Sequence, residues 1–304
     1  MQVPYQGLLV SIIMPTYNRA YCLDRAIQSV LNQTYSKWEL IIIDNHSSDN
    51  TDALVNGYQD PRIFLHKIYN NGIIAASRNM GIMKAKGELL AFLDSDDWWL
   101  ENKLQSSVNK INSGADLVYH DLIISSKLNE SSLFNKPFLT KKFIKTRQVE
   151  YPVYEDLLDF GNAITTSSVV VKKDKINLVG GFSEDESLIS AEDYDLWLRI
   201  SKNSDCKFER ICQPLGYYWI GEENTTSADR TIKTIREILH LYNINNKIPG
   251  WACYSLGRSY YKIGNTALSR KYLSMAIYKD NSWTVRIKAL ITIFFNIFQN
   301  KVNF

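Results

Sequence analysis

Leu89 to Trp99 reads LLAFLDSDDWW, an apolar run that ends abruptly in three carboxylates. Such a run is typical of a buried central strand, and the carboxyl end of a strand is where open α/β sheets bind ligands. Asp94 and Asp96 suit a hard divalent cation that takes further ligands from phosphate oxygens. The alternative is that Asp96 or Asp97 caps a helix beginning at the two tryptophans, since aspartate is a preferred N-cap residue.

The chain before this stretch alternates between apolar runs and segments in which apolar residues recur at helical spacing. The expected strands are Leu8–Pro15, Trp38–Asp44, Ile63–Ile68 and Glu88–Asp94, and the expected helices begin near Tyr21, Asp52, Ile73 and Glu101. This alternation predicts an α/β, Rossmann-like fold with a mostly parallel sheet flanked by helices on both faces.

The middle of the chain contains a long segment without clear periodicity and a second acidic group. Ala115–Ile124 and Ala163–Val171 have strand composition, whereas Ser125–Tyr154 resembles a long loop with a basic cluster and is typical of a functional or mobile segment. Glu192 and Asp193 come directly before an apolar helical pattern. These acids either complement the helix dipole or carry chemistry.

After Ser227 only helical patterns remain. Trp251 to Asn281 resembles a single tetratricopeptide-type hairpin, and we expect it to pack on the preceding domain because one repeat does not stand alone. Trp283–Gln299 is amphipathic with cationic and aromatic edges. It has too few consecutive apolar residues to span a bilayer. We therefore expect this helix to lie in a membrane interface, to pack on the preceding domain or to pack on a second copy of the chain.

The composition is that of an ordinary folded protein, with 304 residues, 45% apolar and 22% charged. A net charge of +3 is too small for this length to indicate a nucleic-acid partner. Four cysteines without CxxC spacing, and a start without signal-peptide features, predict a cytoplasmic protein. No phosphate-binding P-loop, dinucleotide-binding, nucleophile-elbow or zinc-protease signature is present, which disfavours those enzyme classes.

Five ordered segments together resemble a known family. They are VSIIMPTYNRA (10–20), IIIDNHSSDNT (41–51), ASRNMGI (76–82), FLDSDDWW (92–99) and GGF with AEDYDLWLRI (180–200). This order is similar to that of the family 2 inverting glycosyltransferases with the GT-A fold, over residues 8 to 227. The resemblance implies a catalytic domain at 1–227, with a donor half at about 1–124 and an acceptor half at about 125–227, followed by a helical region at 228–304.

By this resemblance the donor is a UDP-sugar. Pro15, Thr16 and Tyr17 would line the nucleoside pocket, Asp44 would pair with the uracil edge, and Arg78 would reach the base or the phosphates. Alternatively, Asp44 is a turn residue and Arg78 a surface cation.

The resemblance also implies that the Asp94-Ser95-Asp96 triplet handles the ribose and a Mn²⁺ or Mg²⁺ ion on the diphosphate. Asp96 is the first choice as direct ligand, and Asp94 the second. A bound metal ion would stabilise the negative charge that develops on the departing UDP.

Inversion requires a base that takes the proton of the acceptor hydroxyl. The family's base corresponds to Asp193, with Glu192 as the second candidate. We expect acceptor recognition at Ser125–Tyr154 and at the loop from Gly180 to Asp193. Two features depart from the family pattern: Asn45 stands where many members have aspartate, and YYWIGEENTTS (217–227) stands where a histidine-containing segment is common.

We therefore predict a metal-dependent, non-processive hexosyltransferase that transfers one sugar to a hydroxyl of a glycan or lipid-linked glycan. Bacterial O-antigen, capsule or exopolysaccharide synthesis, at the cytoplasmic face of the inner membrane, is the expected setting, with a homodimer as a further expectation. The alternative is a catalytically idle scaffold that binds a partner through its helical tail. Asp94, Asp96 and Asp193 argue against it.

Overall fold

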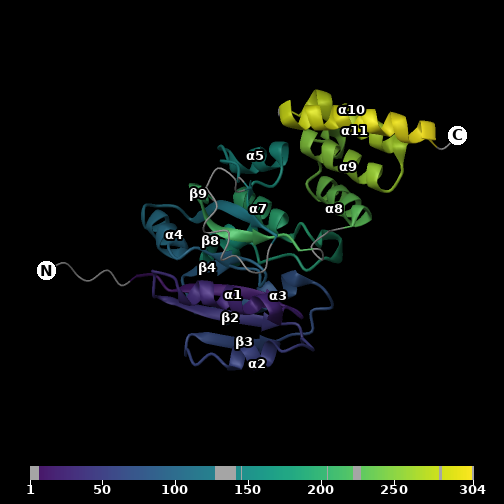
Figure 1. Ribbon diagram of the computed structural model, residues 1–304. Helices are drawn as coiled ribbons and strands as arrows, with labels where there is room; N and C mark the ends of the chain where they lie inside the picture. The colour runs from purple at the N-terminus through teal and green to yellow at the C-terminus, as the bar shows by residue number, and fades with distance from the viewer. Residues whose placement is uncertain are drawn as a thin grey trace. The chain divides into compact units, whose positions relative to one another are not determined.

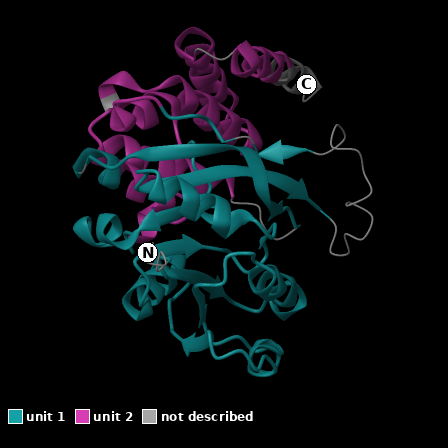
Figure 2. Ribbon diagram, turned by 90° about the vertical axis from the view of Figure 1, so that its left-hand side faces the viewer, with its two compact units in different colours: residues 1–149, 163–184, 199–222 teal, residues 150–162, 185–198, 223–304 magenta. Residues whose placement is uncertain are grey.

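The computed structural model describes residues 7–126, 142–144, 146–203, 205–221, 227–280 and 283–302, with the side chains of 245 and 295–302 left out. Residues 127–141 and 145 of the predicted loop Ser125–Tyr154, and residues 222–226 of the segment 217–227, therefore lie outside the described residues. The chain divides into two compact units (Figure 2): residues 1–149, 163–184 and 199–222, and residues 150–162, 185–198 and 223–304. The predicted domain boundaries stay predictions.

The first unit is a single sheet with helices on both faces (Figure 1). Its strands are β1 (Val10–Thr16), β2 (Trp38–Asp44), β3 (Ile63–Lys67), β4 (Leu89–Phe92), β5 (Trp98–Trp99), β6 (Leu117–Ser125), β7 (Phe143–Ile144), β8 (Val170–Lys172) and β9 (Phe208–Trp219). The order in the sheet is β3-β2-β1-β4-β8-β6-β9-β5, with β7 on β6. β1 to β4 are mutually parallel, and the predicted α/β fold is confirmed.

The helices of this unit cover the apolar central strands. They are α1 (Ala20–Leu31), α2 (Thr51–Asn56), α3 (Ile74–Lys84), α4 (Lys103–Asn112) and α6 (Lys173–Leu178). Alternate residues of a strand point to opposite faces. Ile12 of β1 accordingly packs in one core with α1 and α4, while Ile13 faces Gly81 of α3. Any Cβ at Gly81 would lie 2.5 Å from the Ile13 side chain, so glycine permits this close approach.

The two tryptophans after the acidic stretch form a strand and not the start of a helix. Trp98 and Trp99 pair antiparallel with Tyr217 and Gly216 of β9, and α4 begins only at Lys103. The Trp98 and Tyr217 rings stack with centroids 4.7 Å apart. The prediction that Asp96 or Asp97 caps a helix here is wrong, because burial of these rings against a distant strand outweighs the local capping preference.

The second unit is helical. It contains α5 (Val153–Phe160), the first turns of α7 (Glu192–Asn203), α8 (Ala228–Leu241), α9 (Gly250–Lys262), α10 (Thr266–Lys279) and α11 (Trp283–Val302). α9 and α10 form the predicted hairpin, in which the Ser269 hydroxyl donates to Gly257 O (2.9 Å) and the Tyr260 and Tyr272 rings stack. Within the described residues, no helix is long and apolar enough to cross a membrane.

Candidate active site

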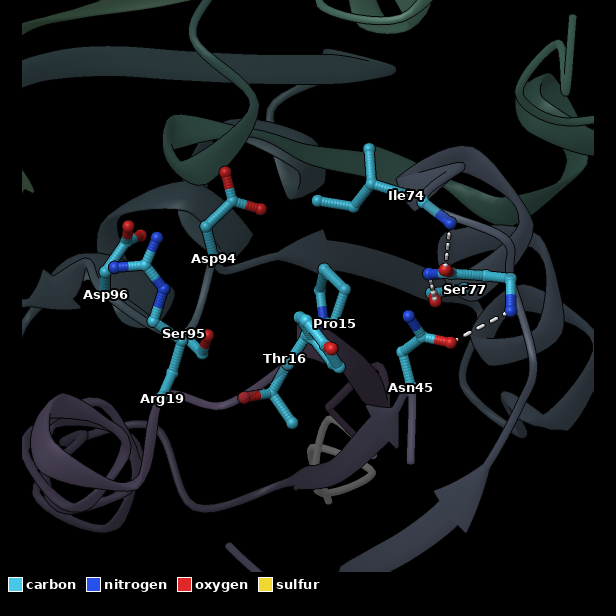
Figure 3. A pocket seen from close by; sticks show the side chains of 12 residues that line it. Pro15, Thr16, Arg19, Asn45, Ile74, Ser77, Asp94, Ser95 and Asp96 are labelled. Atoms are coloured by element: carbon cyan, nitrogen blue, oxygen red, sulfur yellow. Dashed lines mark hydrogen bonds between the residues drawn. The ribbon is translucent and has the colours of Figure 1, made fainter. Parts of the chain in front are cut away.

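A cavity of about 300 Å³ opens at the carboxyl ends of the parallel strands (Figure 3). It is lined by Pro15, Thr16, Tyr17, Arg19, Asn45, Asn70, Gly72, Ile74, Ser77, Asp94, Ser95 and Asp96. The chain runs outward from β1 through β2 to β3 and then returns to place β4 on the other side of β1. The strand order therefore reverses between β1 and β4, which is where open α/β sheets leave a crevice for ligands.

The acidic loop after β4 forms one wall of this cavity. Asp94, Ser95 and Asp96 lie on one side, facing Asn45 and Ser77 across the cavity (Figure 3). The carboxyl end of β4 thus presents two carboxylates to the cavity, as the sequence predicts.

A buried arginine forms an ion pair with Asp94. Arg78 of α3 is only 3% exposed, and its Nη2 donates to Asp94 Oδ1 at 2.9 Å. The Asp94 N–H donates to Ser167 Oγ at 3.2 Å. Arg78 does not line the cavity, so in this structure it orients Asp94 and is not the exposed surface cation of the alternative interpretation.

Asp96 is positioned through its main chain. Arg25 of α1 donates to Asp96 O at 3.0 Å, and its guanidinium lies 3.5 Å from the centroid of the Trp98 ring. The Arg19 side chain lies beside Asp96 in the same cavity wall (Figure 3). Burial, followed by the charge of Asp96, raises the pKa of the nearby Cys22 thiol to about 11.

The third carboxylate of the stretch is part of the core. Asp97 is 2% exposed, and its Oδ1 accepts from the Trp219 N–H of β9 at 2.8 Å. Burial raises the pKa of this carboxyl well above its usual range, and the charges of Asp96 and Asp94 raise it further. Asp97 therefore ties the acidic loop to β9 and does not line the cavity.

The end of β2 presents Asn45, and not Asp44, to the cavity. Asp44 is fully buried, where it accepts from the Ser47 N–H (3.1 Å) and from Lys67 Nζ (2.6 Å). Asn45 Oδ1 accepts from the Asn70 N–H at 2.9 Å, which leaves the amide nitrogen of Asn45 on the cavity side (Figure 3). Asp44 thus contacts the turn that follows β2, as in the alternative interpretation of the sequence, and the Asn45 side chain lines the cavity.

The residues present fit a hard divalent cation. Asp94 and Asp96 offer carboxylate oxygens, the ligands that Mg²⁺ and Mn²⁺ prefer, at the rim of a cavity of about 300 Å³. In the part of the chain that the structure describes, no three His, Cys, Asp or Glu residues cluster as a complete metal cage. Two protein carboxylates suit an ion that takes its other ligands from water and from a diphosphate.

The second acidic group lies in the helical unit. Asp193 Oδ1 accepts from the Tyr194 N–H at 2.6 Å, and Asp193 Oδ2 accepts from Asn162 Nδ2 at 3.3 Å. Glu192 is buried and accepts from the Ser190 N–H at 2.8 Å. Asp193, but not Glu192, lines a separate cavity of about 250 Å³.

Comparison with known proteins decides the family. Residues 11–164, half of the chain, match the sequence model described as Glycosyl transferase family 2. The chain belongs to glycosyl transferase family 2. It is an inverting glycosyltransferase with the GT-A fold, as the sequence predicts.

The relatives of this glycosyltransferase include a curated enzyme and solved structures. It is 35% identical to UDP-Glc:alpha-D-GlcNAc-diphosphoundecaprenol beta-1,3-glucosyltransferase WfgD of Escherichia coli over 198 residues, 65% of this chain and 71% of that protein. Its fold is similar to that of S. aureus TarS 1-349 in complex with UDP-GlcNAc (TM-score 0.60, 16% identity, 94% of this chain and 88% of that chain). Its fold is also similar to that of the Pyrobaculum calidifontis mannosyltransferase PcManGT in complex with GDP-Man and Mn²⁺ (TM-score 0.57, 16% identity, 95% of this chain and 87% of that chain).

Several residues that line or support the two cavities of this glycosyltransferase are not predicted from its sequence. Asn70 and Arg25 support the cavity at the strand ends, while Asn162 and Trp251 line the cavity of Asp193. The ASRNMGI signature, which contains Ser77, points to the neighbourhood of Asn70. No local pattern indicates Asn162 or Trp251, because each reaches the cavity from a different helix or loop.

Proposed function

We propose that this glycosyltransferase transfers single sugars from a UDP-sugar to a hydroxyl of a glycan or lipid-linked glycan, with a divalent cation. The observation that carries the proposal is the Asp94-Ser95-Asp96 wall of a polar cavity at the reversal of strand order. Pro15, Thr16 and Tyr17, on the end of β1 and just beyond it, are the proposed nucleoside wall.

Donor binding uses the charges that line this cavity. Asp94 and Asp96 would hold a Mn²⁺ or Mg²⁺ ion, with Asp96 as the first choice, and the ion would neutralise the diphosphate as it departs. Arg19 adds a cation to the same wall, and Arg78 fixes the orientation of Asp94 at 2.9 Å. Asn45 offers an amide N–H where the family often has an acid, so it suits a donor group with a hydrogen-bond acceptor.

The acceptor side uses Asp193 as the base. The bond from the acceptor oxygen to the anomeric carbon forms, the bond from that carbon to the phosphate oxygen breaks, and its electron pair leaves with UDP. The acceptor's hydroxyl proton passes to Asp193. Two N–H groups, from Tyr194 and Asn162, orient this carboxylate at 2.6 and 3.3 Å, which is the positioning that general-base catalysis needs. Glu192 is buried in a turn and supports the loop.

The setting proposed is bacterial surface-polysaccharide synthesis at the cytoplasmic face of the inner membrane. WfgD, named for a diphosphoundecaprenol acceptor, supports a lipid-linked acceptor here. A stripe on α11 supports membrane contact, because five large apolar side chains at helical spacing are each 49% to 74% exposed. They are Trp283, Ile287, Leu290, Ile291 and Phe294. Arg286 and Lys288 on the same helix suit anionic headgroups.

Sedimentation with vesicles tests this membrane contact. The protein is expected to pellet with vesicles of phosphatidylglycerol and less with phosphatidylcholine alone. Ile287→Asp combined with Ile291→Asp is expected to abolish pelleting, whereas Tyr278→Asp, at an 84% exposed position of α10, is the matched control. Equal pelleting of the stripe variant and the parent would contradict membrane contact by α11.

Calorimetric titration tests the donor proposal. The panel contains UDP, UDP-, GDP- and CMP-sugars, each measured with Mn²⁺ and with a chelator. Binding of a UDP-sugar that the chelator removes is expected, and Asp96→Ala is expected to show the same loss in the presence of Mn²⁺. Tight binding of a GDP- or CMP-sugar in place of UDP-sugars would overturn the donor class. Binding that survives the chelator would overturn the metal requirement.

A further inference from the structure

Asn45 lies on the side of the proposed donor cavity that is opposite the carboxylates. It follows β2, whereas Pro15 and Thr16 end β1 and Asp94 follows β4. In the sheet β1 lies between β2 and β4, so Asn45 is two strand spacings, about 10 Å, from the carboxylate side (Figure 3). A nucleotide whose diphosphate lies at Asp94 and Asp96 extends over its ribose to its base, which would place the base beside Asn45.

The orientation of the Asn45 amide is fixed by its partner. The amide oxygen accepts from the main-chain N–H of Asn70 at 2.9 Å. Because a backbone N–H can only donate, the oxygen of the amide and not its nitrogen must face Asn70. The amide nitrogen points to the cavity (Figure 3), and it makes no hydrogen bond to any residue that the structure describes. This side of the cavity therefore presents an N–H donor to a ligand.

The support of this amide is itself held in place. Asn70 Nδ2 donates to Ser77 Oγ at 2.8 Å, and Asn70 Oδ1 accepts from the Gly72 N–H at 2.9 Å. The rings of His46 and Tyr69, which join the same two connections, stack with centroids 3.7 Å apart. Rotation of the amide by half a turn would leave a backbone N–H without its acceptor, which is unfavourable. The N–H donor is therefore in place before a ligand binds.

We propose that Asn45 selects the nucleobase of the donor by donating its amide N–H to a carbonyl oxygen of the pyrimidine. Uracil presents two such oxygens, one on each side of its N3–H. The sequence predicts instead that Asp44 pairs with the uracil edge, and a carboxylate could pair only with the N3–H. This inference rests on the proposed function, since it takes the diphosphate to lie at Asp94 and Asp96. It adds which residue reads the base and with which polarity.

Calorimetry with modified nucleotides tests this contact in the full chain. The probes are UDP, 2-thio-UDP, 4-thio-UDP and 2′-deoxy-UDP, each with Mn²⁺. Sulfur accepts hydrogen bonds weakly. Replacement of the carbonyl oxygen that the amide contacts is therefore expected to weaken binding about threefold to tenfold, while the other thio analogue binds like UDP. Equal affinity of UDP and both thio analogues would overturn the proposal.

Asn45→Asp assigns this loss of affinity to the amide. The carboxylate has nearly the same size and still accepts from the Asn70 N–H, but it has no N–H to donate. UDP and the weaker thio analogue are therefore expected to bind this variant equally. The added negative charge acts on both nucleotides alike and cancels in the ratio of their affinities. Asn45→Ala, which adds no charge, is expected to give the same result. A sulfur effect of the parent's size in both variants would overturn the proposal.

Asn71→Asp is the matched control. Asn71 lies between two lining residues, but it is exposed and does not itself line the cavity. Its φ of +51° is a left-handed conformation in which aspartate is often found. This variant is expected to keep the sulfur effect of the parent. If Asn45→Asp keeps that effect and instead removes the effect of the 2′-deoxy group, the amide contacts the ribose and the proposal is wrong.

The same titrations separate this proposal from the proposed function. If UDP binds with Mn²⁺ but the sulfur effect does not depend on Asn45, the donor assignment stands and the base contact fails. If the sulfur effect depends on Asn45 but binding survives a chelator, the base contact stands and the metal requirement fails. Absence of binding by every uridine nucleotide would overturn both.

Discussion

Two groups of aspartates, one in each unit of the molecule, have opposite surroundings. Asp94 accepts from a buried arginine at 2.9 Å, and the cavity around it and Asp96 includes Arg19. Asp193 accepts from neutral N–H groups, in a cavity with aromatic walls and no Lys or Arg among the described lining residues. The same side chain thus occurs once beside two arginines and once in a cavity whose other described lining residues are apolar, aromatic or neutral polar.

This difference assigns different chemistry to the two groups. Carboxylates that are oriented by neighbouring arginines can share a metal ion with an anionic diphosphate. A carboxylate that is oriented by N–H donors at the wall of a separate cavity is positioned to take a proton from a neutral hydroxyl. The comparison therefore predicts that changes at Asp193 affect turnover, whereas changes around Asp94 and Asp96 affect donor and metal binding.

The largest effect is expected from Asp193→Asn. The amide keeps the shape of the side chain but has no basic oxygen, so turnover is expected to fall by roughly 10²–10⁴-fold. The affinity for the UDP-sugar, measured by calorimetry, is expected to stay within twofold of the parent. The release of UDP in the presence of a glycan acceptor measures kcat for the variant and the parent.

Asp195→Asn is the matched control for this change. Asp195 lies in the same first turn of α7, but it is buried and accepts from the Tyr242 hydroxyl at 2.6 Å. Its replacement is expected to lower thermal stability and to leave kcat within a few-fold. Equal turnover by Asp193→Asn and the parent would remove Asp193 from the chemistry and break the comparison.

An intermediate effect is expected from Arg78→Met. The variant keeps apolar packing against Phe182, whose ring centroid lies 5.3 Å from the guanidinium carbon, but leaves Asp94 without its cation. Because groups that orient a metal-binding side chain typically contribute 10- to 100-fold, we expect a loss of about that size in affinity for the metal-bound donor. Calorimetry with Mn²⁺ and UDP-sugar measures it.

Arg210→Met separates donor binding from general stability. Arg210 forms an ion pair of 2.8 Å with Asp121 in the same unit, and neither residue lines the donor cavity. Both variants are expected to unfold at lower temperature, since each leaves a carboxylate without its partner. Only Arg78→Met is expected to weaken the donor. Equal donor affinity in the two variants would show that Arg78 is structural alone.

The sequence predicts the two acidic groups better than their surroundings. The alternation of elements and the ordered motifs predict that Asp94 and Asp96 follow a strand end, and in the structure both residues line a cavity. In IIIDN, however, consecutive side chains at the end of a strand point in opposite directions. Pattern alone therefore could not tell that Asp44 is buried while Asn45 lines the cavity.

Contacts between distant segments are the part that the sequence could not supply. Trp98 forms β5 because it pairs with Tyr217, more than a hundred residues further along the chain. Asn162 and Trp251 reach the cavity of Asp193 from separate parts of the chain. Local propensity contains no information on such long-range contacts, because they depend on how whole helices and strands pack.

The smallest effect is expected from Arg25→Ala. Arg25 donates to the main-chain oxygen of Asp96 at 3.0 Å, and its guanidinium stacks on the Trp98 ring. One hydrogen bond and one cation–π contact contribute roughly 1 kcal/mol each, of which only part concerns the position of Asp96. We therefore expect the Mn²⁺ concentration for half-maximal activity to rise about threefold to tenfold, with kcat at saturating Mn²⁺ little changed.

Arg62→Ala is the control for this change. Arg62 also stacks on a tryptophan, with its guanidinium carbon 3.7 Å from the centroid of the Trp38 ring, but Arg62 does not line the donor cavity. A similar Mn²⁺ requirement in both variants would show that stacking at β5 supports the fold and not the metal-binding loop.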